Sequence, residues 1–499
     1  MKPAPKRDPK ILLVNAPHFR LFSPGVSYLQ LGILSMAAVL RESGFDVSVY
    51  DPDFDPGFVR KSAYNIGYPP GYKEAYAKNL HDRAHPVWKD VRRTIGRADP
   101  DVVGISFTTF DCDSASEVAA IAKGINGDAV TVVGGHHVNA LPGDAMRERL
   151  FDFGVLGEGE LTMLELAKAL RSGGRTDKIK GLAFRKGGRV RTTGRMPMIK
   201  DLDSLPFPAR DLLLDAGKYP PHVMGSMITS RGCPYECGFC TTPPMYGRAI
   251  RMRSAENVFA EMKQVKSEFG TSFFTFHDDV CTFDRKRMSD LCDLIRKGRL
   301  DVMWTCVTRA DLLDRGLVEK MKSAGCFGIS IGAESGSQAI LDSIPKRTDI
   351  GTLARTSEMV RGAGMNLHLF FTVGHADETE ASMDETDRMI DELCPTTLNV
   401  SRVIPFPGTR TYYEAVKDGR FVRRNWHDYR MKLRNIGEAA FMKRLLGMRA
   451  QAHRKNLSGI RRTVADPRFI ARYSKENIRS PRELLMYATE FIKTQLSAQ

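Results

Sequence analysis

Three cysteines in a C-x3-C-x2-C spacing constrain the fold and chemistry of this chain more than any other feature. They are Cys233, Cys237 and Cys240, and they follow a short apolar stretch at 223–228. Iron–sulfur clusters are held by cysteine thiolates, so three closely spaced cysteines can bind three irons of a [4Fe–4S] cluster and leave the fourth iron open. A zinc site would need a fourth Cys or His nearby, and a disulfide would leave one thiol over. The spacing therefore predicts a cluster with one iron open to a small molecule.

An aromatic residue, Phe239, directly precedes the last cysteine. With it, the segment resembles the signature of the radical S-adenosylmethionine (SAM) enzymes. The resemblance implies that the open iron chelates the amino and carboxylate groups of SAM, and that an electron from the cluster splits SAM into methionine and a 5′-deoxyadenosyl radical. It also implies that Phe239 packs near the adenine and that an external donor of the flavodoxin or ferredoxin type supplies the electron.

The region 8–175 alternates strand-like and helix-like segments. This alternation predicts an α/β fold with a parallel, doubly wound sheet, Rossmann-like or flavodoxin-like. Ligands of such sheets bind outside the carboxyl ends of the strands. The predicted strands are 10–15, 45–50, 101–106, 130–135 and 153–156, and the predicted helices are 29–43, 115–125 and 160–171.

Glycine and small polar residues gather at the predicted strand ends, where glycine permits a large ligand to approach the backbone. The pattern resembles the cobalamin-binding domain that precedes the radical SAM core in one large subclass. The D-x-H-x-x-G motif is absent, which implies that no histidine of that motif binds the lower face of cobalt. A flavodoxin-like domain for another nucleotide is the alternative. The resemblance implies cobalamin contacts from Asn15, Ser106, Thr108, Gly134, Gly135, His136, Gly157 and Glu158.

Two segments around this domain lack a clear helix or strand pattern. The stretch 54–97 is rich in Tyr, Pro and Gly and is predicted to be a long loop, either a cover for the substrate side of cobalamin or a surface excursion. The stretch 176–222 is predicted to be a linker, with a small hairpin at 181–190 and an extended, proline-containing piece at 203–210.

Six strand–helix units, one of them with a helix at 255–269, are predicted in the region 223–410, which suits the partial (β/α)6 barrel of the radical SAM core. Chemistry in parallel barrels belongs at the carboxyl ends of the strands. Residues at three of those ends resemble family elements that contact SAM, and a solvated barrel rim is the alternative. Of two adjacent aspartates there, one is expected to accept hydrogen bonds from the SAM ammonium group. The implied SAM contacts are Asp278, Asp279, Arg309, Glu334 and Ser335.

Further features of this region bear on the subclass. The segment 404–409, Ile-Pro-Phe-Pro-Gly-Thr, closely resembles an element of cobalamin radical SAM proteins, including those that act on tetrapyrroles and hopanoid lipids. His375 departs from the subclass pattern and is either a SAM or substrate contact or a neutral change. The six remaining cysteines are dispersed, so they are expected to be small buried hydrophobes. A second cluster is therefore not expected, which counts against methylthiotransferases.

The region 411–499 carries most of the net charge of +15, with 20 Lys or Arg against 8 Asp or Glu. It is predicted to hold helices at 441–453 and 481–496, forming either a helical cap on the barrel or a surface for anionic membranes. Nucleic acid is not expected as a partner. The cysteine usage and the lack of a long apolar segment favour a cytoplasmic protein, either free or in contact with the inner membrane surface.

The sequence thus predicts a cobalamin-dependent radical SAM enzyme with four regions: 8–175, 176–222, 223–410 and 411–499. Methylation of an unactivated carbon, with methylcobalamin and a 5′-deoxyadenosyl radical, is the expected reaction. The alternatives are a radical cyclase, ring contraction or oxidation without methyl transfer, and a cobalamin or redox sensor. The substrate class is expected to be a small molecule, a lipid or a tetrapyrrole-like compound.

Overall fold

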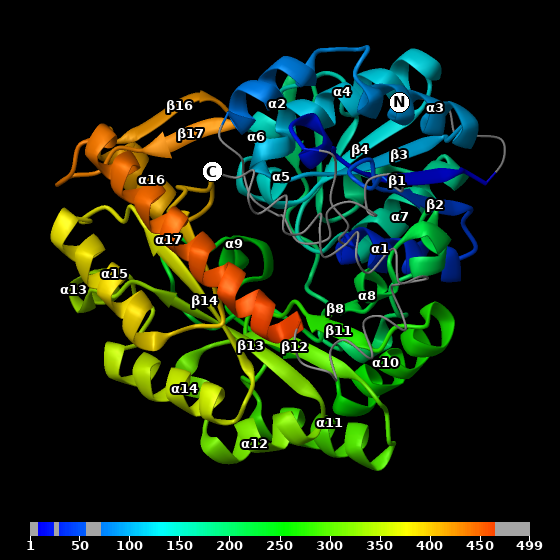
Figure 1. Cartoon of the computed structure of the whole chain (residues 1–499). Coiled ribbons are helices and arrows are strands. Elements are labelled where there is room, and N and C mark those ends of the chain that lie inside the picture. Colours follow the sequence, from blue (N-terminus) through cyan, green and yellow to red (C-terminus); the bar gives the residue numbers. More distant parts are fainter. Residues whose placement is uncertain (1–7, 24–28, 56–70, 465–499) are drawn as a thin grey trace.

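The computed structural model describes residues 8–23, 29–55 and 71–464. It contains two large sheets, each with helices packed on it, which meet along one side of the molecule (Figure 1). The first sheet has the strand order β2-β1-β3-β4-β5-β6-β7, and its first five strands are parallel. These five are β1 (Ile11–Asn15), β2 (Val47–Tyr50), β3 (Val102–Ser106), β4 (Val130–Gly134) and β5 (Phe153–Val155).

Side-chain alternation along the strands builds a core on each face of this sheet. Ile11 and Leu13 of β1 point to one face, and Leu12 and Val14 point to the other. The first face is covered by α1 (Leu31–Glu42) and α7 (Gly159–Ser172). The second face is covered by α2 (Tyr72–Leu80), α3 (Pro86–Ala98) and α4 (Cys112–Ile125), while α5 (His136–Ala140) and α6 (Pro142–Ala145) follow β4. The doubly wound prediction is confirmed.

Two expectations about the flanking segments need correction. The stretch 54–97 contains α2 and most of α3, whose Tyr76, Trp88 and Val91 are buried in the core, so its described part is neither a loop nor a surface excursion. Its residues 56–70 lie outside the described part of the chain. The predicted hairpin forms as β6 (Leu182–Lys186) and β7 (Arg189–Thr192), but it adds antiparallel to β5 and extends the first sheet.

The second sheet is the predicted six-stranded partial barrel, with all strands parallel in the order β15-β14-β13-β12-β11-β8. Helices on its outside connect successive strands (Figure 1). The strands are β8 (Ser226–Met227), β11 (Phe273–Phe276), β12 (Met303–Thr308), β13 (Cys326–Glu334), β14 (Asn366–Val373) and β15 (Thr397–Arg402). The helices are α10 (Ala255–Phe269), α11 (Arg285–Lys297), α12 (Arg315–Ser323), α13 (Gln338–Ser343), α14 (Ile350–Gly362) and α15 (Glu380–Leu393).

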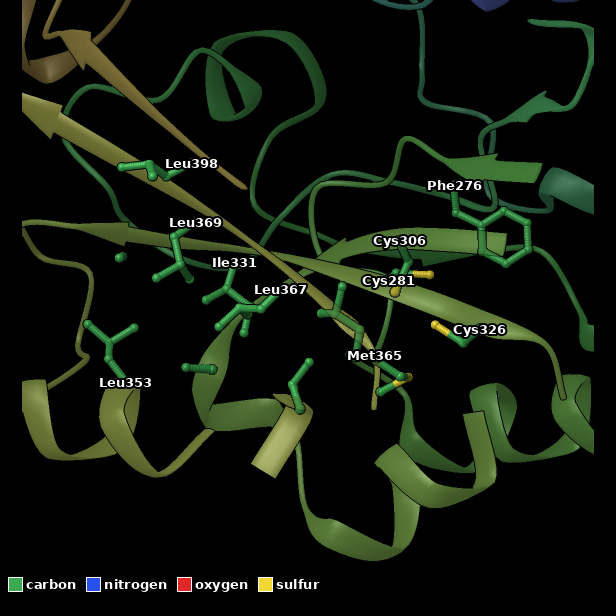
Figure 2. Close-up of a cluster of buried hydrophobic side chains, with 14 of the residues drawn as sticks. Phe276, Cys281, Cys306, Cys326, Ile331, Leu353, Met365, Leu367, Leu369 and Leu398 are labelled. Carbon is green, nitrogen blue, oxygen red and sulfur yellow. The ribbon is translucent and has the colours of Figure 1, made fainter. Parts of the chain in front are cut away.

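Cysteines outside the triplet fill the core, as predicted, with one exception. Figure 2 shows Cys281, Cys306 and Cys326 among the leucines and aromatics between the barrel strands and their helices. Cys112 and Cys292 are also buried, whereas Cys394 is exposed at the end of α15. Burial in apolar surroundings raises the pKa of the Cys292 thiol to about 12, which keeps it protonated and unreactive.

The described part of the C-terminal region packs on the barrel. Helix α17 (Glu438–Val464) lies along β15, the edge strand of the second sheet. Its Asn456 side chain donates to the Leu398 carbonyl at 2.8 Å and accepts from the Leu398 N–H at 2.7 Å. These two bonds satisfy backbone groups of the edge strand that a neighbouring strand would otherwise pair with. The predicted helix 441–453 lies inside α17, and the predicted helix 481–496 lies outside the described residues.

The same region contains a strand pair that the helical prediction missed. After α16 (Arg410–Lys417), the strands β16 (Phe421–Asn425) and β17 (Asp428–Met431) form an antiparallel hairpin. Its Trp426 donates to Asp144 of α6 at 2.6 Å, so the hairpin joins the barrel to the first sheet unit. Among the described helices, none is both long and apolar enough to span a membrane.

Candidate functional site

The three cysteines lie in a loop between two short strands. β9 (Ser230–Arg231) and β10 (Arg251–Met252) pair antiparallel, and the loop they enclose contains the short helix α9 (Thr242–Tyr246). Gly232 opens the loop with a φ of +90°, and a Cβ at this position would lie 2.4 Å from the Ala249 carbonyl oxygen. Only glycine fits this turn without strain, so the loop closes directly above the strand pair.

The two predicted aspartates after β11 do different things. Asp278 is buried, and its carboxylate accepts hydrogen bonds from the backbone N–H of Thr229 at 2.6 Å and of Ser230 at 3.0 Å. It therefore fixes the chain that leads into the cysteine loop. Asp279 is exposed and accepts a bond from the Thr242 hydroxyl at 2.8 Å, and partial desolvation raises the pKa of its carboxyl. Its remaining lone pairs are available to a ligand.

Each cysteine of the loop is a free, partly buried thiol. Burial raises the pKa of Cys237 to about 11, and the nearby charge of Lys346 acts in the opposite direction. Cys240 lies within electrostatic range of both Cys233 and Cys237. Within the described residues, no three His, Cys, Asp or Glu side chains are grouped to hold a single metal ion. A cubane is a different case, because its three cysteines bind three separate irons.

Arg309, a predicted SAM contact, is buried beside the cysteine loop. Its guanidinium lies 3.6 Å from the ring centre of Tyr235, which stands between Cys233 and Cys237. The guanidinium also forms a bidentate pair with Asp311, at 2.9 and 3.1 Å, and donates to the Arg347 carbonyl at 3.1 Å. These contacts use most of its donors, so Arg309 fixes the outer half of the loop.

Glu334 lies at the centre of a buried polar network. It has a φ of +63°, and its two carboxylate oxygens accept from Lys346 at 2.5 Å and from the Thr372 hydroxyl at 3.0 Å. Thr372 also bonds to Nε2 of His375 at 3.0 Å, and the His375 ring packs edge-on against Phe239 at 5.8 Å. Burial lowers the pKa of His375 to about 4, so this ring is neutral near pH 7. The network connects the end of β13 to the cysteine loop.

Ser335, the last predicted SAM contact, faces the protein interior. Its hydroxyl oxygen lies 3.2 Å from the Thr386 hydroxyl of α15 and accepts from the Ser337 backbone at 3.1 Å. The residue is 1% exposed. Ser335 therefore stabilises the turn after β13, and its hydroxyl bonds to protein groups in place of a ligand.

A large cavity opens where the first sheet meets the cysteine loop. Its empty space is about 1250 Å³, part of which is open to solvent. Strand ends of the first sheet line one side, and Arg231, Met245 and Tyr246 of the cysteine-loop region line the other. An apolar inner part reaches between the sheet and α1, where Leu13, Ile33 and other apolar side chains lie. The shape suits a bulky ligand with an apolar portion.

The predicted cobalamin contacts divide into two groups in relation to this cavity. Ser106, Gly134, Gly135, Gly157 and Glu158 line it. The other three, Asn15, Thr108 and His136, do not belong to its lining, and each is found elsewhere at the sheet edge.

The three predicted contacts outside the cavity have other environments. Asn15 is buried at the end of β1 and bonds to Asp51. The Thr108 hydroxyl donates to Asp111 at 2.6 Å and caps the turn before α4. His136 is exposed at the start of α5. The described residues that line the cavity include no histidine, which fits the absence of the D-x-H-x-x-G motif.

Glu158 has a second role that the sequence did not suggest. Its carboxylate pairs with Arg231 of β9 and with Arg251 of β10, each at 2.8 Å, and accepts from the Ile199 N–H at 2.9 Å. Glu160 adds a further pair to Arg231 at 2.6 Å. Burial alone would raise the pKa of Glu158, but the hydrogen bonds from Arg251 and Arg231 lower it overall. The base of the cysteine loop is thereby attached to the first sheet.

The glycine at the end of β4 provides a test of whether a bulky group fits the cavity. A Cβ at Gly134 would meet the Val155 Cβ at 3.7 Å, which is ordinary van der Waals contact. Neither the backbone conformation nor the packing of the protein therefore requires glycine at this position. A side chain at this position would instead occupy cavity space. The glycine, the apolar depth and the opening to solvent together suit a bulky ligand such as a corrin, part of which would extend beyond the cavity.

Sequence reasoning missed three charged residues of the site. Arg231 and Arg251 flank the cysteine loop, and their shared partner Glu158 lies 73 and 93 residues before them in the sequence. Lys346 lies in a turn after α13 and has no motif around it. For the arginines the short strand pair on either side of the loop was the available signal. For Lys346 the sequence offered none.

Comparison with known proteins agrees with this geometry. Residues 18–167 match the model of the B12 binding domain, and residues 227–390 match the model of the Radical SAM superfamily. The first match contains the strand ends that line the cavity, and the second contains the cysteine loop and the Glu334 network.

Several curated proteins are similar to the chain over much of its length. An uncharacterized methyltransferase of Pyrococcus horikoshii is 34% identical over 69% of this chain and 75% of its own length. The cytidylyl-2-hydroxyethylphosphonate methyltransferase of Streptomyces wedmorensis is 28% identical over 86% of each chain. An anaerobic magnesium-protoporphyrin IX monomethyl ester cyclase of Rubrivivax gelatinosus is 30% identical over 65% of this chain and 60% of its own.

Solved structures share the fold. The cobalamin-dependent SAM radical enzyme OxsB, with aqua-cobalamin and SAM bound, matches 98% of this chain and 71% of its own with a TM-score of 0.67 at 18% identity. The radical SAM methyltransferase TsrM of Kitasatospora setae matches 84% of this chain and 76% of its own with a TM-score of 0.64 at 18% identity. With the two domain matches and the Pyrococcus relative, the cysteine loop and the cavity lead to one conclusion: this chain belongs to the cobalamin-dependent radical SAM enzymes, whose cofactors are cobalamin, SAM and a [4Fe–4S] cluster.

Proposed function

We propose that the protein methylates an unactivated carbon of a small-molecule substrate. The observation that carries this proposal is the shared lining of the cavity. Strand ends of the B12 binding domain and residues of the cysteine-loop region face the same space, so cobalamin held there would lie beside the loop that would hold the cluster and SAM. When bound, SAM and the cluster supply a hydrogen-abstracting radical, and cobalamin supplies a methyl group.

Different residues of the chain would hold the cluster and SAM, and others position the cysteine loop. Cys233, Cys237 and Cys240 would hold the cluster, and the free lone pairs of Asp279 would accept from an ammonium group beside it. Asp278 positions the loop from below and Arg309 positions it from outside. Buried carboxylates and a neutral His375 keep this side of the site ordered and partly withdrawn from water.

Ser106, Gly134, Gly135 and Gly157 would border the corrin, since they line the cavity at the strand ends. No cavity-lining residue of the described chain is a histidine, so the lower face of cobalt would lack a protein nitrogen ligand. With cobalamin's own base displaced as well, electron paramagnetic resonance of the loaded protein would show no superhyperfine coupling from a lower nitrogen.

The test of this function is a product assay with anaerobically reconstituted protein. Candidate substrates come from the classes on which the relatives act, a cytidylylated phosphonate and a magnesium tetrapyrrole monomethyl ester, together with lipids. Methylation adds one CH₂ unit to the product mass and consumes a second SAM to restore the methyl group. SAM cleavage without a methylated product would contradict the proposal.

A radical cyclase is the second candidate, because the Rubrivivax relative that matches this chain at 30% identity is named as one. Cyclisation changes the product mass through loss of hydrogen or gain of oxygen and transfers no methyl group. Methyl-deuterated SAM therefore separates the two: label in the product supports methylation, and an unlabelled cyclic product supports the cyclase. A protein that never cleaves SAM would be a sensor.

A substitution in the cavity tests the cobalamin site. Gly134→Val is expected to weaken cobalamin retention about tenfold or more, because crowding extra methyl groups into an occupied site costs about 1–3 kcal/mol. The backbone at Gly134 accepts a Cβ without a clash, and valine suits a strand, so the variant is expected to fold. Cobalamin absorbance after gel filtration measures the retained fraction.

The matched control is Gly217→Val. Gly217 is exposed, has no positive φ, and a Cβ added there meets nothing within 4 Å. It lies outside the cavity lining. Equal cobalamin content in the wild-type protein and both variants would show that cobalamin binds elsewhere.

A further inference from the structure

Helix α16 directly contacts the cysteine loop. The backbone N–H of Thr411 donates to the Gly238 carbonyl at 3.0 Å, and Gly238 lies between Cys237 and Cys240. The Arg410 side chain also approaches this glycine, 3.8 Å from the position of an added Cβ. A single hydrogen bond therefore separates the backbone of the predicted cluster ligands from a helix on the molecular surface.

The sequence around α16 explains why it lies there. The preceding element Pro405–Thr409 places Gly408, with a φ of +88°, against Ala140 of the first unit and Pro244 of α9. A Cβ at Gly408 would come within 3.1–3.2 Å of both side chains. Thr409 then caps α16 by accepting from the Tyr412 N–H at 3.1 Å. The helix thus begins at the junction of both units and the cysteine loop.

One face of α16 is open and has a mixed character. Arg410, Tyr413, Val416 and Lys417 are spaced three and four residues apart, so they share a side of the helix, while Ala415 is buried on the other side. Tyr413 is 55% exposed and Val416 is 48% exposed, so the centre of this side of the helix is apolar and open to solvent. We call these four residues the α16 face.

The surroundings of the α16 face are basic. The segment 410–434 holds eight Lys or Arg against three Asp or Glu. All three acids are already paired, Glu414 with Arg410, Asp418 with Arg420 and Arg434, and Asp428 with Lys73 and Arg424. On the cysteine loop itself, the exposed Glu236 pairs with Arg248. An apolar centre with a positive border is typical of a surface that docks an acidic protein.

We propose that the α16 face docks the acidic one-electron carrier protein that reduces the cluster. In this step one electron leaves the reduced carrier, which is oxidised, and enters the cluster held by the three cysteines, whose charge falls from 2+ to 1+. The proposal rests on the proposed function, because it needs a cluster in that loop. The contact between α16 and Gly238 gives the electron a short path from the docked carrier to the cluster. The positive charge around the α16 face favours an acidic carrier.

The test uses an acidic bacterial flavodoxin as the probe and the double variant Arg410→Glu/Lys417→Glu. Reversing two charges at the docking border is expected to weaken flavodoxin binding by about tenfold or more, measured by calorimetry at low salt on the full-length protein. SAM cleavage driven by flavodoxin is expected to fall accordingly. Cleavage driven by dithionite, a small reductant that needs no docking surface, is expected to stay at the wild-type rate.

The control variant is Lys89→Glu, the same type of charge reversal on an exposed residue of α3, which lies on the other side of the molecule from α16 (Figure 1). It is expected to bind flavodoxin as the wild-type protein does. A third variant, Tyr413→Ser, tests the apolar centre without changing charge and is expected to weaken binding as well.

Four results would overturn the proposal. They are no flavodoxin binding by the wild-type protein at low salt, equal binding by the double variant, an equal loss with Lys89→Glu, and a parallel loss of the dithionite-driven reaction. Sedimentation with anionic vesicles that the same double variant abolishes would assign the face to a membrane instead. The proposed function fails by a separate result, an absence of SAM cleavage by the wild-type protein with dithionite.

Discussion

Replacing Cys237 with alanine is expected to abolish SAM cleavage and to lower the iron content of the reconstituted protein. A cubane with one iron open to SAM needs the other three irons to be held by cysteines, and the loop between β9 and β10 offers three. Loss of one thiolate leaves two ligands, too few to keep the cluster. Cys233→Ala and Cys240→Ala are expected to have the same effect. Iron analysis and chromatography of 5′-deoxyadenosine measure both outcomes.

The control for this prediction is Cys394→Ala. Cys394 is the exposed cysteine at the end of α15, and its loss removes one thiol without touching the loop. Iron content and SAM cleavage are expected to match those of the wild-type protein. Cobalamin retention is a second internal check, because the cavity lining does not include Cys237. Undiminished SAM cleavage in all three loop variants would refute the cluster assignment.

The sequence predicted the element order well where the pattern was periodic and apolar. The predicted helix 255–269 agrees with α10 at both ends, because Ser254 caps its start and Gly270 ends it with a φ of +69°. The segment 54–97 was misread because Tyr, Pro and Gly were taken as signs of a loop. Tyr76 and Trp88 are instead core residues of α2 and α3.

The sequence predicted where the site residues lie, but it did not predict which groups they bond to. Glycines at the strand ends marked the cavity, and the cysteine spacing marked the loop. Whether a carboxylate faces a ligand depends on which groups fold against it, and those groups are far away in the sequence. Asp278 and Asp279 are neighbours, yet Thr229 and Ser230 occupy the first while the second keeps free lone pairs. No local pattern distinguishes the two.

Glu158 shows the same limit, and its contacts lead to the second large prediction. Glu158→Gln is expected to lower the free energy of unfolding by about 3–5 kcal/mol, because removing one partner of a buried ion pair leaves Arg251 without a carboxylate, while Arg231 keeps Glu160. The Glu158 side chain is 4% exposed, and Arg231 and Arg251 are 12% and 10% exposed. Urea unfolding followed by circular dichroism measures the change. Glutamine keeps the volume of the side chain, so packing is a minor contributor.

The effect has a defined pH dependence. Hydrogen bonds from Arg251 and Arg231 lower the pKa of Glu158 in the folded protein below its ordinary value of 4.5. A carboxyl whose pKa is lower in the folded state contributes its full stability above the unfolded pKa and loses it as pH falls through the folded pKa. The difference between wild-type protein and Glu158→Gln is therefore expected to be constant near neutral pH and to shrink below about pH 4.5.

The matched control is Glu165→Gln on the same helix region. Glu165 is 49% exposed and pairs with Lys168 three residues along α7, and a surface pair of this kind contributes about 0–1 kcal/mol. Its substitution is expected to have little effect at any pH. Equal destabilisation by the two variants would show that the ion pairs of Glu158 contribute no more to stability than the surface pair of Glu165. A large loss confined to Glu158→Gln would instead mean that the cysteine loop is held against the cobalamin domain by this carboxylate, because both strands that flank the loop carry one of its arginine partners.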